Sequence, residues 1–175
     1  METCKLTDAE TTWESDQLTI KVKYLDEFAT NLSMPRKGDL GIDLYANEQV
    51  YIPKGKAALV STGISLQLPV GYALLLKDRS SMSKTTHVLA GVIDNSYTGE
   101  IKVRMLCHRE QEEPGPVWQD VLIHEDPRQG VIIKKGQKIA QALIVPDLTA
   151  IFKLQEVEEL SDTNRGSDGF GSTGS

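Results

Sequence analysis

The sequence predicts an all-β fold, a jelly-roll-like sandwich or barrel, and three observations lead to it. Apolar and polar residues alternate over 18–25 (LTIKVKYL), with Leu18, Ile20, Val22 and Tyr24 on one side. This period of two is typical of a strand with one buried face. Short apolar stretches then recur along the chain, and Gly or Pro separates them. Many short strands with frequent turn signals indicate a β-sandwich or barrel.

The further strands are expected where these stretches lie, at 51–52, 57–60, 64–68, 72–76, 88–93, 101–105, 131–133 and 139–145. The turns between them contain Pro and Gly, the residues that set the dihedral angles of tight turns, as in Pro53–Gly55 and Pro69–Gly71. A short helix is expected over Met82–His87.

Three segments differ in composition from this β domain, which is expected to cover residues 18–160. Residues 1–17 are polar and acidic, which predicts a disordered N-terminal arm. Residues 161–175 are rich in Gly and Ser and predict a flexible C-terminal arm. Residues 107–130 are acidic and turn-rich yet contain Trp118 and the apolar run Val121–Ile123, which indicates a loop or small hairpin inserted between two strands.

Length and charge limit the classes of function. A chain of 175 residues fits one domain, and 39% hydrophobic residues suffice for its core. The net charge of −6 argues against a protein that grips long nucleic acids. Cys4 and Cys107 have neither a disulfide framework nor metal-ligand spacing around them. With no membrane-spanning apolar run and no signal peptide, we expect a soluble cytoplasmic protein that contacts neither nucleic acid nor membrane.

Five short segments contain the residue types that chemistry requires, and they lie at 38–46 (GDLGIDLYA), 78–84 (DRSSMSK), 90–100 (AGVIDNSYTGE), 135–144 (KGQKIAQALI) and 165–174 (RGSDGFGSTG). Each has a simpler interpretation when taken alone. Glycine-rich turns join strands in many β proteins, Arg79-Ser80-Ser81 could cap a helix, and Asp94 could stabilise a turn. Phe170 in a Gly/Ser tail could be incidental, or part of a segment that folds on binding.

Together and in this order, the five segments resemble the conserved motifs of the trimeric dUTPase family. The third and fifth segments are the most specific, and the resemblance covers residues 18–175. It implies a jelly-roll-like subunit of a homotrimer that hydrolyses dUTP to dUMP and pyrophosphate. Such an enzyme keeps uracil out of DNA and supplies dUMP for thymidylate synthesis.

The resemblance assigns base and sugar recognition to the third segment. Its hairpin, with Gly91, Val92 and Ile93, would close around uracil, and main-chain groups near Gly91 and Lys102 would bind the base. Glycine at position 91 would let the backbone approach a flat base closely. Tyr97 would lie under the deoxyribose and fill the space of a ribose 2′-hydroxyl.

Asp94 is the predicted catalytic residue. A carboxylate can orient and deprotonate a water for in-line attack on the α-phosphorus. No Ser–His or Cys–His pair points to a covalent intermediate instead. The three histidines, His87, His108 and His124, lack metal-site spacing and are interpreted as surface or structural residues.

The remaining motifs are expected to bind the triphosphate, whose charge needs neutralising in the transition state. By resemblance the phosphate ligands are Arg79, Ser80, Ser81, Gln141, Arg165 and the backbone of Gly171, Ser172 and Thr173. Phe170 would stack on the uracil. Mg²⁺ is the expected cofactor, held mainly by phosphate oxygens and water. Asp43 would lie near that hydrated ion or in a subunit contact.

The resemblance also implies that three chains build each active site: one contributes the hairpin, a second Arg79–Ser81 and Gln141, and a third the C-terminal arm. The sequence departs from the family at Ser96, where Asp is common, at Thr98, where Arg is common, and at Gln137-Lys138, which replaces Asp-Arg. None of these changes removes a residue assigned to chemistry.

Two other functions remain to be compared with this one. A dCTP deaminase shares the fold but lacks the Gly-Phe-Gly-Ser-Thr tail and uses a glutamate elsewhere. A regulatory binding protein gated by nucleotide is the second alternative, because some phage-encoded members bind a protein partner through an insert at the position of residues 107–130. The simpler interpretation of this insert is an extra hairpin packed on its own trimer.

Overall fold

The computed structural model describes residues 18–108 and 130–162. Within these ranges the chain forms β-strands and one 3₁₀ turn, at β1 Lys21–Tyr24, β2 Ile42–Tyr45, β3 Val50–Pro53, β4 Ala57–Gln67, β5 Tyr72–Lys77, β6 Thr86–Leu89, β7 Val92–Ile93, β8 Glu100–Cys107, β9 Gly130–Ile133, β10 Lys138–Pro146 and η2 Thr149–Ile151. The predicted all-β fold is therefore confirmed. The calls on residues 1–17, on most of the insert and on the tail from residue 163 lie outside the described residues.

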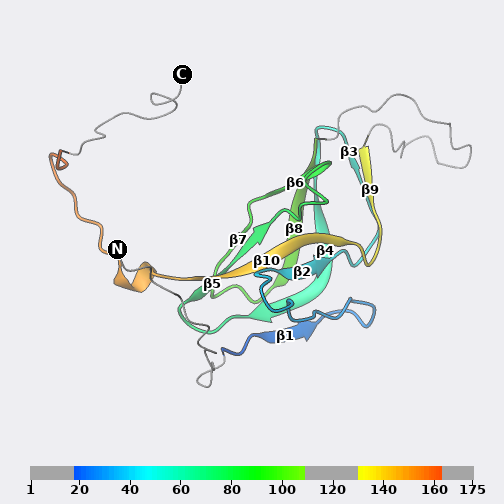
Figure 1. The fold of residues 1–175 in the computed structure, drawn as a ribbon, viewed down its shortest axis with the longest axis horizontal. Helices are drawn as coiled ribbons and strands as arrows, with labels where there is room; N and C mark the ends of the chain where they lie inside the picture. Colours follow the sequence, from blue (N-terminus) through cyan, green and yellow to red (C-terminus); the bar gives the residue numbers. More distant parts are fainter. Residues whose placement is uncertain (1–17, 109–129, 163–175) are drawn as a thin grey trace, which may run out of the picture.

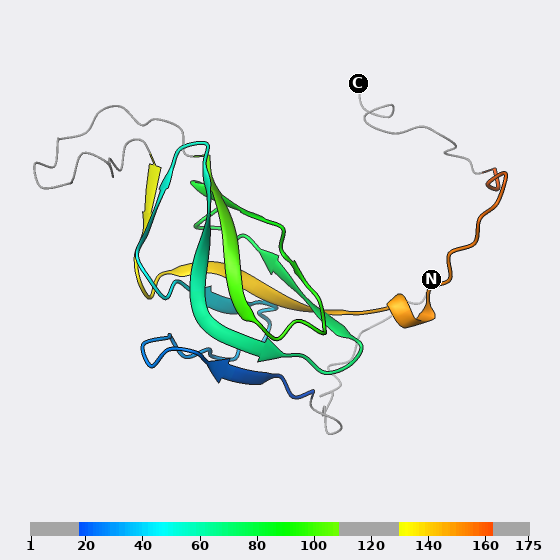
Figure 2. The same ribbon diagram turned by 180° about the vertical axis from the view of Figure 1, so that it is seen from behind.

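The strands form two four-stranded antiparallel sheets, with orders β1-β4-β8-β6 and β2-β10-β5-β7, and a two-stranded ladder of β3 and β9. Most neighbours in a sheet are distant in sequence, so the chain crosses repeatedly between sheets, as in jelly-roll folds. Figures 1 and 2 show β8 and β4 curving along one side and the long β10 crossing the other.

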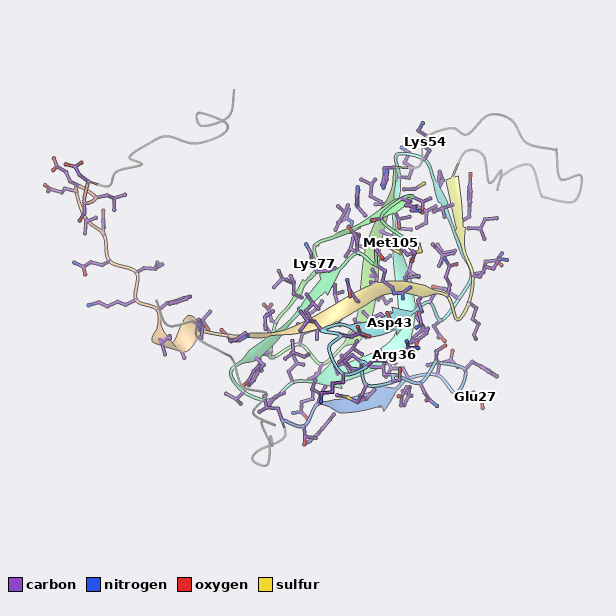
Figure 3. All side chains as sticks on the ribbon, viewed as in Figure 1. Glu27, Arg36, Asp43, Lys54, Lys77 and Met105 are labelled. Atoms are coloured by element: carbon purple, nitrogen blue, oxygen red, sulfur yellow. The ribbon has the colours of Figure 1, made fainter. Side chains whose placement is uncertain are left out.

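The hydrophobic core lies between the two sheets because alternate residues of their strands point inward. In β8, Ile101, Val103, Met105 and Cys107 are all buried, and the residues between them are more exposed. Leu44, Ile52, Leu74 and Ile139 meet them from other strands. Figure 3 shows Met105 within the body, whereas Glu27 and Lys54 project at its edges.

The first strand differs from the prediction. It begins at Lys21, and Val22 and Tyr24 of its expected buried face remain 38% and 41% exposed. The reason is topological, since β1 lies at the sheet edge and pairs with β4 alone. The stretches expected at 57–60 and 64–68 instead merge into one strand, β4, whose register with β8 shifts around Gly63, a residue with φ of 68°.

The helix predicted over Met82–His87 is wrong. Residues 80–85 form turns, in which the Thr86 N–H donates to the Met82 carbonyl oxygen at 2.8 Å. The chain then enters β6 because Thr86 pairs with Cys107 of β8 and the two strands continue side by side. The stretch 88–93 is likewise divided between β6 and β7, at a turn where Ala90 has φ of 51°.

The C-terminal segment 147–162 runs away from the sheets (Figures 1 and 2). Its apolar side chains are poorly covered: Phe152 is 68% exposed, Leu154 100% and Leu160 87%. A segment that leaves such side chains unburied on its own subunit has a surface suited to contact another chain. Over the described residues, no helix is both long enough and apolar enough to cross a membrane.

Candidate active site

A pocket of about 350 Å³ lies where the chain passes from β7 to β8, at the predicted hairpin. Among the described strands β7 pairs with β5, and β8 pairs with β4 and β6, so β7 and β8 form no ladder with each other. We keep the name hairpin for residues 92–102 and call this cavity the hairpin pocket. Val92 and Ile93 of β7, Asp94 and Tyr97 of the connecting turn, and Glu100 and Lys102 of β8 line it, together with Leu59 of β4. The pocket thus unites four of the residues predicted to select the nucleotide, Val92, Ile93, Tyr97 and Lys102, with the predicted catalytic carboxylate. Leu59 and Glu100 were not predicted, because neither stands out in the sequence from other strand residues.

Asp94 and Tyr97 are held in one tight turn. The Tyr97 N–H donates to the Asp94 carbonyl oxygen at 3.1 Å, and the Tyr97 hydroxyl donates to the Glu100 carbonyl oxygen at 3.0 Å. A Cβ at position 99 would lie 2.6 Å from the Tyr97 hydroxyl oxygen, so Gly99 is needed for the ring to lie there. The Asp94 side chain is exposed. Within the described residues no hydrogen bond or ion pair reaches its carboxylate.

Glu100 ties the hairpin to the shifted part of β4. Its carboxylate accepts hydrogen bonds from the Ser61 hydroxyl and from the Gly63 N–H at 3.1 Å, and the Lys102 ammonium lies 3.3 Å away. Partial burial opposes ionisation, but the hydrogen bonds from Ser61 and Gly63 and the charge of Lys102 outweigh it and lower the pKa of the Glu100 carboxyl. Glu100 is therefore an ionised anchor of the pocket wall.

Gly91 has a packing role that the sequence did not reveal. It does not line the pocket; its carbonyl oxygen accepts a 2.6 Å hydrogen bond from Leu76 N–H of β5. A Cβ at position 91 would lie 2.3 Å from the Leu76 carbonyl oxygen. Glycine is thus required here for the close approach of two protein backbones.

A second group of predicted residues gathers where β2 and β10 pair, with Asp43 opposite Gln141. The Arg79 Nε lies 2.7 Å from one Asp43 oxygen, and the Lys138 Nζ lies 2.6 Å from the other. We call Asp43, Arg79 and Lys138 the cation cluster. Gln141 is held beside it, because its Nε2 donates to the Asp78 carbonyl oxygen at 2.9 Å. Figure 3 shows Asp43 at β2.

Within the cation cluster, Asp43 and Lys138 shift each other's pKa. Partial burial alone would raise the pKa of the Asp43 carboxyl, but the hydrogen bond and charge of Lys138 and the charge of Arg79 lower it overall. The Asp43 carboxylate in turn raises the pKa of the Lys138 ammonium. Both oxygens of Asp43 are thus engaged by cations.

The phosphate-binding candidates lie outside the hairpin pocket. Arg79 and Gln141 do not line it, and neither do Ser80 and Ser81, which lie in the turn after Arg79. The other predicted ligands, Arg165, Phe170, Gly171, Ser172 and Thr173, fall outside the described residues. One chain therefore presents two separate sets of site residues.

Two histidines contact the segment 78–83, which contains Arg79. The rings of His87 and His108 stack with centroids 4.1 Å apart. His87 Nδ1 lies 3.2 Å from the Asp78 carboxylate, and His108 Nε2 lies 2.9 Å from the Ser83 carbonyl oxygen. These contacts fit the structural role expected of both residues. Across 18–108 and 130–162, no three His, Cys, Asp or Glu side chains come together as a metal site.

The family follows from comparison with known proteins. The sequence model of the dUTPase family matches residues 29–112 and 119–174. The chain belongs to the dUTPase family. A deoxyuridine 5′-triphosphate nucleotidohydrolase of Clostridioides difficile is 35% identical over 159 residues, which cover 89% of this chain and 97% of the relative. Hydrolysis of dUTP, the predicted enzyme activity, is thereby confirmed for this dUTPase.

Solved dUTPase structures share its fold. The dUTPase of Staphylococcus bacteriophage 80alpha with dUpNHpp superposes with a TM-score of 0.74 at 29% identity, covering 90% of this chain and 99% of that one. That study describes phage dUTPases as controlling the transfer of virulence genes. The D95N mutant dUTPase from phage phi11 of S. aureus has a TM-score of 0.68 at 28% identity, with coverage of 81% and 97%, and is described as coordinating a structural Mg(II) ion.

Proposed function

We propose that this dUTPase works by attack of an Asp94-activated water on the α-phosphorus of dUTP, which releases pyrophosphate and leaves dUMP. The observation that carries the proposal is the exposed Asp94 carboxylate at the pocket wall, without a partner among the described residues. A carboxylate not neutralised by a cation can accept a proton from a water beside it. The water's oxygen forms the new bond to phosphorus as the bond to the pyrophosphate oxygen breaks.

The pocket selects the base and the sugar. The limited volume of the pocket and the apolar side chains of Leu59, Val92 and Ile93 suit a flat base. Main-chain groups of the hairpin form the hydrogen bonds to the polar edge of the base. Cytosine would present reversed donors and acceptors there and leave buried groups unpaired. The Tyr97 ring is held by the hydrogen bond from its hydroxyl to the Glu100 carbonyl oxygen. It supports the deoxyribose and excludes a 2′-hydroxyl.

The triphosphate is bound by a neighbouring subunit of a homotrimer. This part of the proposal is supported by the separation of Arg79, Ser80, Ser81 and Gln141 from the hairpin pocket of the same chain. The exposed apolar side chains of 147–162 fit a segment that extends over another subunit and brings Arg165 and the Phe170 arm to a third chain's site. Three chains then share each active site.

Mg²⁺ is proposed as the cofactor, bound through the substrate's phosphate oxygens and water. When bound, it neutralises phosphate charge and orients the triphosphate. The donor set of the described residues fits this mode, because Asp94 is a single exposed carboxylate and Asp43 already contacts two cations. Asp43 therefore acts on the metal and phosphates indirectly, by holding Arg79.

A mixing experiment tests the shared site. Asp94→Asn and Arg79→Ala are each expected to abolish most dUTP turnover when prepared alone. If the hairpin and Arg79 of one site come from different chains, refolding the two variants together restores about a quarter of the sites by random assortment. The measurement is pyrophosphate release per chain.

A matched control uses both substitutions on the same chain, mixed with inactive Asp94→Asn protein. This mixture cannot assemble a site with both residues intact and should stay inactive. Mixed single variants that remain inactive although mass spectrometry shows mixed trimers would contradict the shared site.

A regulatory role through the insert is the second candidate. It is favoured by the description of the phage 80alpha relative as a controller of gene transfer and by the apolar residues Trp118 and Val121–Ile123 in an otherwise acidic segment. The test is to replace residues 109–128 with a short Gly/Ser turn. Unchanged thermal stability and turnover would support a partner-binding surface, whereas a large loss of stability would show that the insert packs on its own trimer.

A further inference from the structure

The turn that carries Asp94 is anchored by the next residue, Asn95. Its side-chain Nδ2 donates to two main-chain carbonyl oxygens, that of Pro69 at 2.8 Å and that of Tyr72 at 2.9 Å. Pro69 lies in the turn between β4 and β5 and Tyr72 is the first residue of β5, so both acceptors are more than twenty residues away in sequence. Neither hydrogen of the amide nitrogen is left over, so the contact orients the side chain fully.

The β4–β5 turn is a firm support for this contact. Gly71 within it has φ of 85°, which glycine adopts without strain. Its carbonyl oxygen accepts a 2.8 Å hydrogen bond from Asp147 N–H, just after β10. β5 continues from the turn and pairs with both β10 and β7 (Figure 1). Asn95 thus links the Asp94 turn to the centre of a sheet.

The hairpin depends on this link because its first strand, β7, is short and pairs with β5 rather than with β8. β7 contains two residues, and its register with β5 ends at Leu74 and Ile93, immediately before Asp94. On the β8 side, the Ser65 hydroxyl contacts the carbonyl oxygens of Thr98 and Gly99. The Glu100 carboxylate there accepts a hydrogen bond from the Ser61 hydroxyl. On the Asp94 side, the two hydrogen bonds of the Asn95 amide are the side-chain contacts that fix the turn within the described residues.

We propose that Asn95 is a positioning residue for dUTP hydrolysis: its carboxamide fixes the main chain at Asp94 against the β4–β5 turn, so that the Asp94 carboxylate faces the reacting water. The inference rests on the proposed role of Asp94. Asn95 does not line the pocket and acts through its neighbour. Displacing a catalytic group by a fraction of the reacting distance is enough to slow a well-oriented reaction.

The decisive variant is Asn95→Asp in the full-length trimer. It keeps the shape of the side chain but directs an acceptor oxygen at the two carbonyl oxygens. We expect kcat for dUTP to fall about tenfold to a hundredfold at neutral pH, as for loss of two partly buried hydrogen bonds, while KM changes much less.

A pH profile separates positioning from mere loss of stability. Protonation of the new carboxyl restores one O–H donor, so the ratio of variant to parent kcat should rise as the pH falls. Asp94 precedes the new carboxyl in the chain, and Glu100 and Lys102 line the same pocket as Asp94. The N–H of Asp147 bonds to Gly71, and its carboxylate accepts from Thr149. All of these groups are also present in Asn95→Ala, which therefore gives the baseline for the ratio. Asn95→Ala, which has no group to protonate, should show a lowered kcat and a flat ratio.

Ser96→Ala is the matched control, because Ser96 is the exposed next residue of the same turn and its side chain has no hydrogen bond within the described residues. It should keep the parent's kcat. Asp94→Asn is assayed in parallel. Loss of turnover in Asp94→Asn with unchanged kcat in Asn95→Asp and Asn95→Ala overturns the inference and leaves the proposed function standing. Retained turnover in Asp94→Asn overturns the proposed function and the inference together.

Discussion

Asp94 and Asp43 are aspartates of two sequence motifs, and their surroundings are opposite. Asp94 lies exposed on the hairpin pocket, and its carboxylate has no partner among the described residues. Asp43 lies between Arg79 and Lys138, 2.7 and 2.6 Å from its two oxygens. A free carboxylate can take a proton from water, whereas a carboxylate paired with two cations is a poor base but a good anchor. In the proposed mechanism, therefore, the hairpin carries the chemistry and the cation cluster sets the binding geometry.

Replacing the free carboxylate should have the largest effect. Asp94→Asn keeps the size of the side chain but removes its basicity, so we expect turnover to fall by about two to four orders of magnitude while dUTP still binds. Single-turnover assays and nucleotide binding measure the two quantities. Glu48→Gln, which neutralises an exposed carboxylate in the turn before β3, is the control and should retain full turnover. Turnover close to that of the parent would remove Asp94 from its role.

Truncating the pocket should change selectivity more than rate. Tyr97→Ala opens the space proposed to exclude a 2′-hydroxyl, so the ratio of kcat/KM for UTP to that for dUTP should rise by about one to two orders of magnitude. Tyr97→Phe removes the hydrogen bond to Glu100 but keeps the ring, and should change the ratio less. An unchanged ratio in Tyr97→Ala would mean that sugar selection lies elsewhere.

Breaking the cation cluster should weaken binding without changing selectivity. Asp43→Asn removes the charge that holds Arg79, and kcat/KM should fall about tenfold for dUTP and UTP alike, the usual scale of one charge-assisted hydrogen bond. Lys138→Met leaves the Asp43–Arg79 pair in place and should have a smaller effect. A change in the UTP-to-dUTP ratio of Asp43→Asn would contradict the division of labour between the two regions.

The smallest expected effect concerns stability against pH. The folded state lowers the pKa of Asp43, so its contribution is present above the carboxyl's unfolded value and is lost as the pH falls through the folded value. Since the pair is partly exposed, we expect at most about 1 kcal/mol. Thermal melts of the parent and Asp43→Asn between neutral and acidic pH measure it. The difference in melting temperature should shrink towards low pH; a difference that grows on acidification would contradict the pairing.

Much of the hairpin pocket was predictable because its residues are close in sequence. The spacing from Val92 to Lys102 places a strand, a turn and a second strand in one local unit, so Asp94 and Tyr97 come together as predicted. The helix expected at Met82–His87 failed for the opposite reason. Local composition allowed a turn of helix, but pairing of Thr86 with Cys107, more than twenty residues further on, determined a strand.

The sequence by itself determined the β class, through apolar residues at a period of two between Gly and Pro turns, and the order of the motifs. Tertiary structure alone decided which residues of different motifs meet. Asp43 reaches Arg79 and Lys138 because β2 pairs with β10, and Glu100 reaches Ser61 and Gly63 because β4 shifts its register against β8. A period of two gives each strand its inward face but not its neighbour, and the neighbour is chosen by the packing of all the strands at once.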